Sequence, residues 1–222
     1  MNEHPILEKS QYITDLPSKN PFKIDASNQF TEKDERLVWQ QFIDGDDKSL
    51  IYIYNKYVDM LYSYGRQFSK NYELIRDCIG ELFCDLMDKR SGLSSAQSVK
   101  AYLFASLKRR VLKEKKKNEK FLFEEEGFSF SLAESALSIS GNLKEQDFAL
   151  INQKLNELSV NQREAIYLHF YEGMSYAEIA DVLKIKVDSV RTLTYRALAS
   201  LQKQIDPYLS SFYTLLICFV IQ

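Results

Sequence analysis

Apolar residues recur every three or four positions along most of the chain, a spacing that is typical of amphipathic helices. Between residues 37 and 86 three such stretches follow one another, and a fourth begins near Val99. In the first stretch the pattern places Leu37, Val38, Gln41 and Phe42 on one short apolar face. The first two stretches are separated by residues 44–47, whose sequence DGDD is typical of a turn. We therefore predict a helical domain over residues 34–118.

The second half of the chain carries two capping boxes, in residues 159–162 (SVNQ) and 175–178 (SYAE). In this motif a Ser hydroxyl and a Gln or Glu side chain satisfy backbone N–H groups at the start of a helix. The second box opens a short apolar helix that contains Ala180, and a longer helix is expected over about residues 187–204. A short helix, a tight turn and a longer helix are typical of a helix-turn-helix. We predict this second domain over residues 154–205.

Three segments lie outside these two domains. Residues 1–33 contain three of the four prolines and no sustained periodicity, so we expect a flexible amino-terminal arm. Residues 119–153 are acidic and rich in serine, which predicts a flexible linker. Residues 206–222 predict an apolar C-terminal helix, shorter than the roughly 20 residues that cross a bilayer. This helix either packs against a domain or regulates the chain, by holding the domains together or by docking a partner.

The composition favours a helical protein. Of 222 residues, 45% are apolar and only 7 are Gly and 4 Pro, which excludes collagen-like, low-complexity and wholly disordered chains. The expected fold class is therefore all-α. The three cysteines, Cys78, Cys84 and Cys218, form no C-x-x-C pair, and the start of the chain lacks a basic segment followed by an apolar run. We therefore expect no secretory signal and a reducing compartment, the cytoplasm.

The formal net charge is only -2, but the charges are distributed unevenly. Residues 100–120 hold nine Lys or Arg against two Glu, whereas residues 121–160 hold seven acidic residues against two Lys. The fourth predicted helix therefore has a basic side. A near-neutral total does not exclude a nucleic-acid partner, because phosphates respond to the local surface rather than to the sum of the charges.

The stretch from Leu155 to Leu201, which contains both capping boxes, resembles region 4 of the extracytoplasmic-function group of the sigma-70 family of bacterial transcription initiation factors. Residues 77–86 (DCIGELFCDL) and 99–117 (VKAYLFASLKRRVLKEKKK) resemble region 2 of the same group. The resemblance implies two small helical domains, a region 2 bundle and a region 4 helix-turn-helix, joined by a flexible linker. It also implies a factor that binds core RNA polymerase, recognises promoter DNA through both regions and initiates transcription. An anti-sigma factor is a further candidate partner.

In the family, the helix that resembles residues 77–86 docks on RNA polymerase. The resemblance therefore implies a polymerase contact for five of its residues: Asp77, Glu81, Leu82, Phe83 and Asp85. Carboxylates beside an apolar stripe suit this role, because they pair with basic groups on a partner helix. The alternative is that Leu82 and Phe83 belong to the core and that the acids form a solvated helix face.

The basic helix that follows is implied to bind promoter DNA. Its candidate phosphate contacts are Lys100, Lys108, Arg109, Arg110 and Lys113. The alternative is a solvated Lys-rich helix surface. Tyr102 and Phe104 either stack on an unpaired base or belong to the core. In the family, the loop that corresponds to residues 91–98 captures a flipped promoter base.

In a helix-turn-helix, the first turns of the recognition helix enter the major groove. Seven residues meet this geometry: Lys186, Asp188, Ser189, Arg191, Thr192, Tyr195 and Arg196. Arg191 is the strongest candidate, either for a guanine edge or for a phosphate. Ser175 and Tyr176 begin the preceding helix and are expected near backbone phosphates. The family often has Arg then Leu at the positions of Leu193 and Thr194, so the resemblance does not establish which promoters this chain prefers.

The sequence contains no arrangement that predicts catalysis. His4 and His169 lie far apart in the sequence, and neither a Gly-rich phosphate loop nor a metal-ligand cluster is present in it. We expect no enzymatic activity, no cofactor and no metal. The alternative function is a stand-alone helix-turn-helix transcriptional regulator, whose N-terminal domain senses a ligand or dimerises.

Overall fold

A computed structural model of the chain describes residues 35–118, 127–130 and 145–205. The chain divides into two compact units between Phe123 and Glu124, and each unit is described by itself. In the described residues all regular structure is helical, which confirms the predicted all-α fold class. The predicted N-terminal arm (1–33) and apolar C-terminal helix (206–222) lie outside the described residues.

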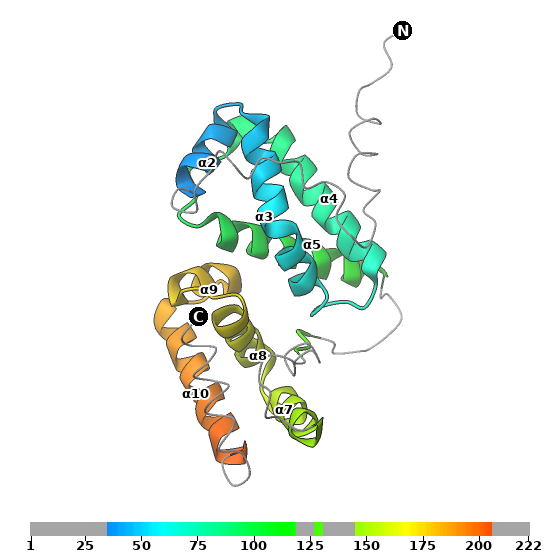
Figure 1. Ribbon diagram of the computed structural model, residues 1–222, viewed down its shortest axis with the longest axis vertical. Helices are drawn as coiled ribbons and strands as arrows, with labels where there is room; N and C mark the ends of the chain where they lie inside the picture. The colour runs from blue at the N-terminus through cyan, green and yellow to red at the C-terminus, as the bar shows by residue number, and fades with distance from the viewer. Residues whose placement is uncertain (1–34, 119–126, 131–144, 206–222) are drawn as a thin grey trace. The chain divides into compact units, whose positions relative to one another are not determined.

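The first unit is a bundle of helices connected by short loops (Figure 1). The elements are α2 (Glu35–Ile43), α3 (Asp47–Gly65), α4 (Tyr72–Asp88), the short 3-10 helix η1 (Arg90–Gly92) and α5 (Val99–Asn118). Helix α3 contacts α2, α4 and α5, and α4 also packs along α5. The long basic helix and the acidic helix α4 are therefore direct neighbours.

Local signals in the sequence fix the ends of these helices. The carboxylate of Asp46 accepts hydrogen bonds from the backbone N–H groups of Lys48 (3.1 Å) and Ser49 (3.2 Å), which caps α3. Gly45, in the predicted turn before it, has a φ of 113°, a conformation that favours glycine. Asn71 caps α4 in the same way as Asp46 caps α3.

The apolar faces of the first unit agree with the predicted periodicity, with one difference in α2. The largest side chains of its core are fully buried: Trp39, Phe42, Leu61, Tyr64, Ile75, Leu86, Leu103, Phe104 and Leu107. In α2 the structure buries Trp39 and leaves Leu37 exposed, although the sequence pattern placed Leu37 on the apolar face. Gly65 allows α3 to approach α4, because a Cβ there would lie 2.7 Å from Cγ2 of Ile75.

The second unit is also helical, and its long last helix runs along one side (Figure 1). The elements are α7 (Glu145–Glu157), α8 (Val160–Ile166), the π-helical turn η3 (Tyr167–Tyr171), α9 (Tyr176–Leu183) and α10 (Val187–Ile205). Helix α10 contacts α7, α8 and α9. Both predicted capping boxes are formed, by Ser159 with Gln162 and by Ser175 with Glu178.

The second unit extends further toward the N-terminus than predicted. Residues 145–153, which we expected in the flexible linker, lie in α7, where Ile151 is buried. Phe128 and Phe130 are also buried, with ring centroids 5.4 and 5.2 Å from that of Tyr167. Two segments of the predicted linker, residues 127–130 and 145–153, therefore pack on the helix-turn-helix domain, which their acidic and Ser-rich composition did not indicate.

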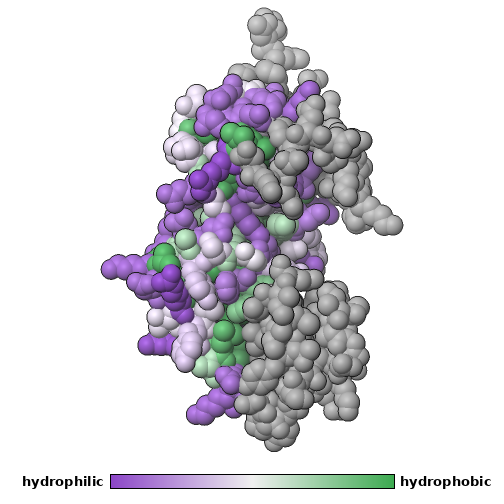
Figure 2. Space-filling view, turned by 60° about the vertical axis from the view of Figure 1, so that its left-hand side comes forward, coloured by the Kyte–Doolittle hydropathy of each residue, from purple (hydrophilic) through white to green (hydrophobic). Residues whose placement is uncertain are grey.

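The face that Figure 2 shows carries both polar and apolar residues. In the view of Figure 2, hydrophilic residues dominate the coloured surface, and hydrophobic residues form small separate areas. In the part of the chain that the structure describes, no helix is both long and apolar enough to cross a membrane.

Candidate nucleic-acid interface

The turn between α9 and α10 sets the direction in which α10 begins. Lys184, the C-cap of α9, has a φ of 57°, which ends the helix in the left-handed conformation. The backbone N–H of Ile185 then donates to the carbonyl of Ala180 at 3.2 Å. Ala180 and Val190 are both buried where the two helices pack. A small residue at position 180 allows this close approach.

The first turns of α10 carry the predicted recognition surface on their exposed side. Every candidate from this part of the chain is exposed: Lys186, Asp188, Ser189, Arg191, Thr192, Tyr195 and Arg196. Val190, Thr194 and Ala197 face the core on the opposite side of the helix. We name the exposed set the α10 face. It presents three cations, two hydroxyl groups and a phenol at positions that reach base edges in helix-turn-helix proteins.

Arg191 is held only weakly in the free chain. Its Nη1 lies 3.1 Å from Oδ1 of Asp188, and the two side chains are 62% and 91% exposed. An ion pair with this exposure contributes little to stability. The hydroxyl of Thr192 donates to the backbone carbonyl of Asp188 at 2.9 Å. The Arg191 guanidinium is therefore free to exchange Asp188 for a base edge or a phosphate at small cost.

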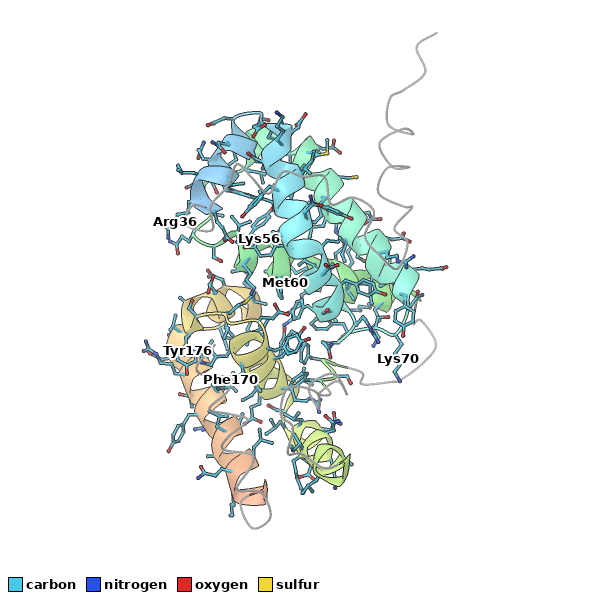
Figure 3. The ribbon with its side chains drawn as sticks, in the orientation of Figure 1. Arg36, Lys56, Met60, Lys70, Phe170 and Tyr176 are labelled. Carbon is cyan, nitrogen blue, oxygen red and sulfur yellow. The ribbon has the colours of Figure 1, made fainter. Side chains whose placement is uncertain are left out.

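Ser175 and Tyr176 lie at the start of α9, but they differ in exposure. Ser175 is exposed, and its hydroxyl already accepts a hydrogen bond from the backbone N–H of Glu178. Tyr176, which is labelled in Figure 3, is half-buried. Its ring stacks on that of His169 with 4.6 Å between centroids. Nδ1 of His169 lies 2.8 Å from the carbonyl oxygen of Met174. These contacts fix the Tyr176 ring beside the start of α9.

Leu193 and Thr194, where the chain departs from the family pattern, face inward. Thr194 is buried, and its hydroxyl donates to the carbonyl of Val190 at 3.0 Å, so its polar group is satisfied within the helix. Leu193 is half-buried. The departure at Thr194 therefore changes the core of the second unit rather than the α10 face.

In the first unit, the predicted basic helix does not present a uniform row of free cations. Arg109 and Lys113 are exposed. Lys100 and Lys108 are half-buried, and their ammonium groups lie over the rings of Phe104 and Phe68 at 5.7 and 6.0 Å. The only buried lysine among the described residues, Lys115, donates to the carbonyl of Phe68 at 3.2 Å.

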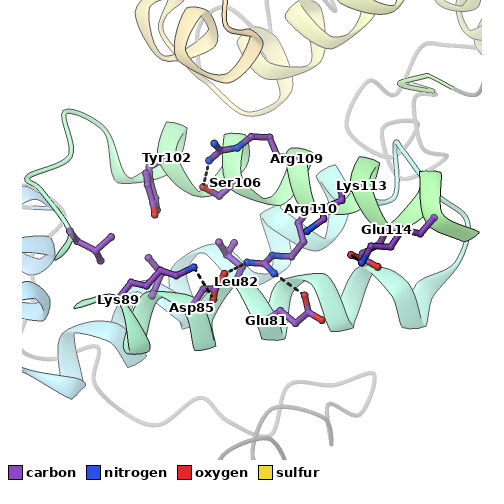
Figure 4. A pocket seen from close by; sticks show the side chains of 13 residues that line it. Glu81, Leu82, Asp85, Lys89, Tyr102, Ser106, Arg109, Arg110, Lys113 and Glu114 are labelled. Carbon is purple, nitrogen blue, oxygen red and sulfur yellow. Dashed lines mark hydrogen bonds and ion pairs between the residues drawn. The ribbon is translucent and has the colours of Figure 1, made fainter. Parts of the chain in front are cut away.

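A groove of about 580 Å³ runs between α4 and α5 (Figure 4). Its walls carry five cations: Lys89, Arg109, Arg110, Lys113 and Lys117. They also carry the carboxylates of Glu81, Asp85 and Glu114. Two of these cations, Lys89 and Lys117, were not among the predicted contacts. Lys89 lies one helical turn after Asp85 and Lys117 one turn after Lys113, a spacing that places each pair on one side of its helix.

Arg110 bridges the two helices across this groove (Figure 4). Its Nη1 donates to Oε2 of Glu81 at 2.8 Å, and its Nη2 donates to Oδ2 of Asp85. Lys89 adds a contact of 3.2 Å to Oδ1 of Asp85. The hydrogen bond from Arg110 lowers the pKa of Asp85, which keeps this carboxylate charged. One predicted DNA contact is thus paired with two predicted polymerase contacts.

The remaining polymerase candidates separate into core and surface. Leu82 and Phe83 are only 3% and 2% exposed, and the Phe83 ring lies 4.9 Å from that of Tyr54. Leu82 and Phe83 are therefore buried in the free chain, because α4 packs its apolar stripe against α3 and α5. Asp77 and Glu81 are exposed and Asp85 is half-exposed. The acidic candidates are therefore the ones that the free chain exposes to solvent.

The aromatic residues of α5 and the loop before it have clear positions. Phe104 belongs to the core, 4.7 Å from the ring of Tyr64. Tyr102 is half-buried, lines the groove and lies 5.5 Å from the ring of Trp39. Within the loop at residues 91–98, the carbonyl of Ser94 accepts a hydrogen bond from Nε1 of Trp39 at 3.1 Å, and Leu93 lines the groove. The loop is thus anchored to α2 and contributes to the lining of the groove.

The described residues contain no group of His, Cys, Asp or Glu that could hold a metal ion. The chemistry that these surfaces offer is the binding of anions by cations, hydroxyl groups and backbone.

The second unit matches a known family. Residues 148–201 match the family model described as sigma-70, region 4. The chain is 33% identical over 67 residues to the RNA polymerase sigma-H factor of Pseudomonas aeruginosa. This alignment covers 30% of the chain and 35% of that protein, so it spans about a third of the relative's length.

Solved structures extend the likeness to the fold of both units. The structure of CnrH in complex with the cytosolic domain of CnrY has a TM-score of 0.55 and 19% identity, over 79% of this chain and 99% of that chain. The sigma factor RpoE in complex with the anti-sigma factor NepR, from Bartonella quintana, has a TM-score of 0.52 and 21% identity, over 73% of this chain and 99% of that chain. Residues 148–201 are thus similar to sigma-70 region 4, and the chain shares the fold of these two solved structures.

Proposed function

We propose that the chain is a sigma factor that binds core RNA polymerase, recognises promoter DNA and initiates transcription, without enzymatic chemistry of its own. The observation that carries this proposal is the α10 face within residues that match sigma-70 region 4. Its cations and hydroxyl groups stand on the first turns of the second helix of a helix-turn-helix, the part that enters the major groove.

The surfaces of the two units support the following proposed roles. The α10 face binds the upstream promoter element, with Arg191 as the principal contact and Ser175 and Tyr176 near the backbone. Arg109 and Lys113, exposed on the groove wall, bind phosphates of the downstream element. Asp77, Glu81 and Asp85 on α4 meet basic groups of the polymerase. Because its proposed partners are core RNA polymerase and promoter DNA, we infer that the protein works in the bacterial cytoplasm.

An anti-sigma factor is a further proposed partner. Two structures with this fold, RpoE with NepR and CnrH with the cytosolic domain of CnrY, were solved as complexes with a second protein. An inhibitor of this class would cover the acidic side of α4 or the α10 face, because either surface is needed for initiation.

Transcription reconstituted from purified chain and core RNA polymerase on genomic fragments tests the proposal. We expect defined transcripts only when both proteins are present. Arg191→Ala should reduce them, whereas Lys203→Ala, an exposed cation at the other end of α10, should not. Tight operator binding by the chain alone, without transcripts in the presence of polymerase, would instead identify a stand-alone helix-turn-helix regulator.

A further inference from the structure

We propose that Arg110 couples polymerase binding to DNA binding within the first unit, by exchanging its carboxylate partners for a DNA phosphate. In the free chain Arg110 pairs with Glu81 and Asp85. When basic groups of the polymerase take over these two carboxylates, the guanidinium becomes available to DNA in the groove. This inference rests on the proposed function and adds a sequence of events to it. The contact between the first unit and the downstream promoter element becomes stronger after the polymerase has bound.

The geometry makes Arg110 common to both surfaces. The Arg110 side chain projects from α5, the basic helix. Its two acceptors, Glu81 and Asp85, lie one helical turn apart on α4, the acidic helix. Figure 4 shows the side chain crossing the groove between them. A group in this position cannot give its full charge to DNA while it also neutralises two carboxylates.

The exposure of the three side chains allows an exchange. Glu81 and Asp85 are 59% and 41% exposed, whereas Arg110 is 22% exposed. A partner therefore reaches the carboxylates from the outside without displacing the arginine first. Ion pairs with partners this exposed are weak, so a competing cation of the polymerase can replace Arg110 at small cost.

Arg110 also has one N–H donor that its two carboxylate partners do not use. Its Nε is buried and has no hydrogen-bond partner among the described residues. Once the side chain has left the two carboxylates, its Nε and one Nη can donate two parallel hydrogen bonds to a phosphate, whereas the carboxylates leave Nε without an acceptor. Other cations of the groove would add to the electrostatic attraction for a phosphate bound by Arg110. They are Lys89, Arg109 and Lys113.

The exchange predicts a reciprocal effect. If polymerase binding frees Arg110 for DNA, DNA binding must free Glu81 and Asp85 for polymerase by the same factor, because coupling between two sites is symmetric. The free chain would then bind DNA through this groove less well than its local charge suggests.

The test is DNA binding by the free full-length chain, with Asp85→Asn, Glu81→Gln and a matched control. The control is Asp88→Asn, which removes the same charge from an exposed position of α4 that has no part in the Arg110 bridge. Fluorescence anisotropy with a labelled oligothymidylate measures affinity at several salt concentrations. We expect Asp85→Asn and Glu81→Gln to bind about two- to fivefold more tightly than Asp88→Asn. The slope of log K against log salt should steepen by about 0.7, the value for one added phosphate contact on a single strand.

A second comparison separates Arg110 from general electrostatics. In an Arg110→Gln background, Asp85→Asn should have no larger effect on DNA affinity than Asp88→Asn. Thermal melts of each variant identify any that do not fold. Equal affinities for Asp85→Asn and Asp88→Asn, or a gain that persists without Arg110, would overturn the coupling. The proposed function has a different readout, because its failure is the absence of transcripts from wild-type chain with core polymerase.

Discussion

The Nε of Arg163, on α8, donates a hydrogen bond of 3.1 Å to the backbone carbonyl of Phe128, 35 residues earlier in the chain. A second donor of the same side chain, Nη1, bonds the carbonyl of Asn156 at 2.7 Å. Arg163 therefore ties residues 127–130 to the end of α7 and to α8. The helix-turn-helix domain includes a segment that precedes the region 4 match at residue 148.

Truncating Phe128 should destabilise the second unit. Its ring is fully buried beside Tyr167, so Phe128→Ala would leave a cavity and lower the free energy of unfolding by about 3 to 5 kcal/mol. Urea denaturation of the full chain measures this loss. Ser129→Ala, an exposed neighbour, is the control. Similar unfolding curves for the two variants would mean that residues 127–130 do not contribute to the domain.

Removing the Arg191 side chain should weaken binding to the upstream element. Loss of a base contact costs about 1 to 3 kcal/mol and relaxes sequence preference at one position, whereas loss of a phosphate contact weakens all sequences alike. Footprinting of Arg191→Ala holoenzyme on promoter variants at several salt concentrations distinguishes the two roles. If Arg191→Ala protects every promoter as strongly as Lys203→Ala does, the recognition surface lies elsewhere.

Enlarging Ala180 should disturb the helix-turn-helix. Ala180 is buried where α9 packs on α10, so Ala180→Leu overpacks this contact at a cost of about 1 to 3 kcal/mol and shifts the start of α10. We expect a lower melting temperature and weaker promoter binding than for Ala177→Leu, which adds the same atoms at an exposed position of α9. If Ala180→Leu has the melting temperature and the footprint of the wild-type protein, the contact between α9 and α10 accommodates a larger side chain and the prediction is wrong.

Cys78 should resist alkylation in the folded protein. Burial raises the pKa of its thiol to about 11, against an ordinary value near 8.5, and the thiolate is the reactive form. At pH 8 the thiolate is therefore scarce, and iodoacetamide should modify Cys78 about a hundredfold or more slowly than an unfolded peptide. The rate should rise about tenfold per pH unit up to pH 10. Peptide mass spectrometry follows the modification, and equal rates with and without urea would exclude this burial.

The helix-turn-helix was readable from the sequence because its signals are local. Ser159 and Ser175 cap helices through contacts within four residues, and both capping boxes form as predicted. The exposed side of the recognition helix follows from helical periodicity once Val190 and Ala197 are assigned to the core.

The features that the sequence pattern missed depend on distant parts of the chain. Phe128 and Phe130 stand on either side of an exposed Ser129, an alternation that is a weak signal beside three glutamates. Their rings pack against Tyr167, which lies more than 35 residues further along the chain. The pairing of Arg110 with α4 likewise needs the packing of two helices that a local pattern does not specify. Periodicity alone did not distinguish Leu37 from Trp39 as the buried residue of α2.

The central claim is that the α10 face directs core RNA polymerase to promoters, and reconstituted transcription tests it most directly. Wild-type chain and Lys203→Ala with core polymerase should produce the same defined transcripts from genomic fragments, and Arg191→Ala should produce fewer. Absence of defined transcripts from the wild-type chain, or equal transcripts from all three proteins, would contradict the claim.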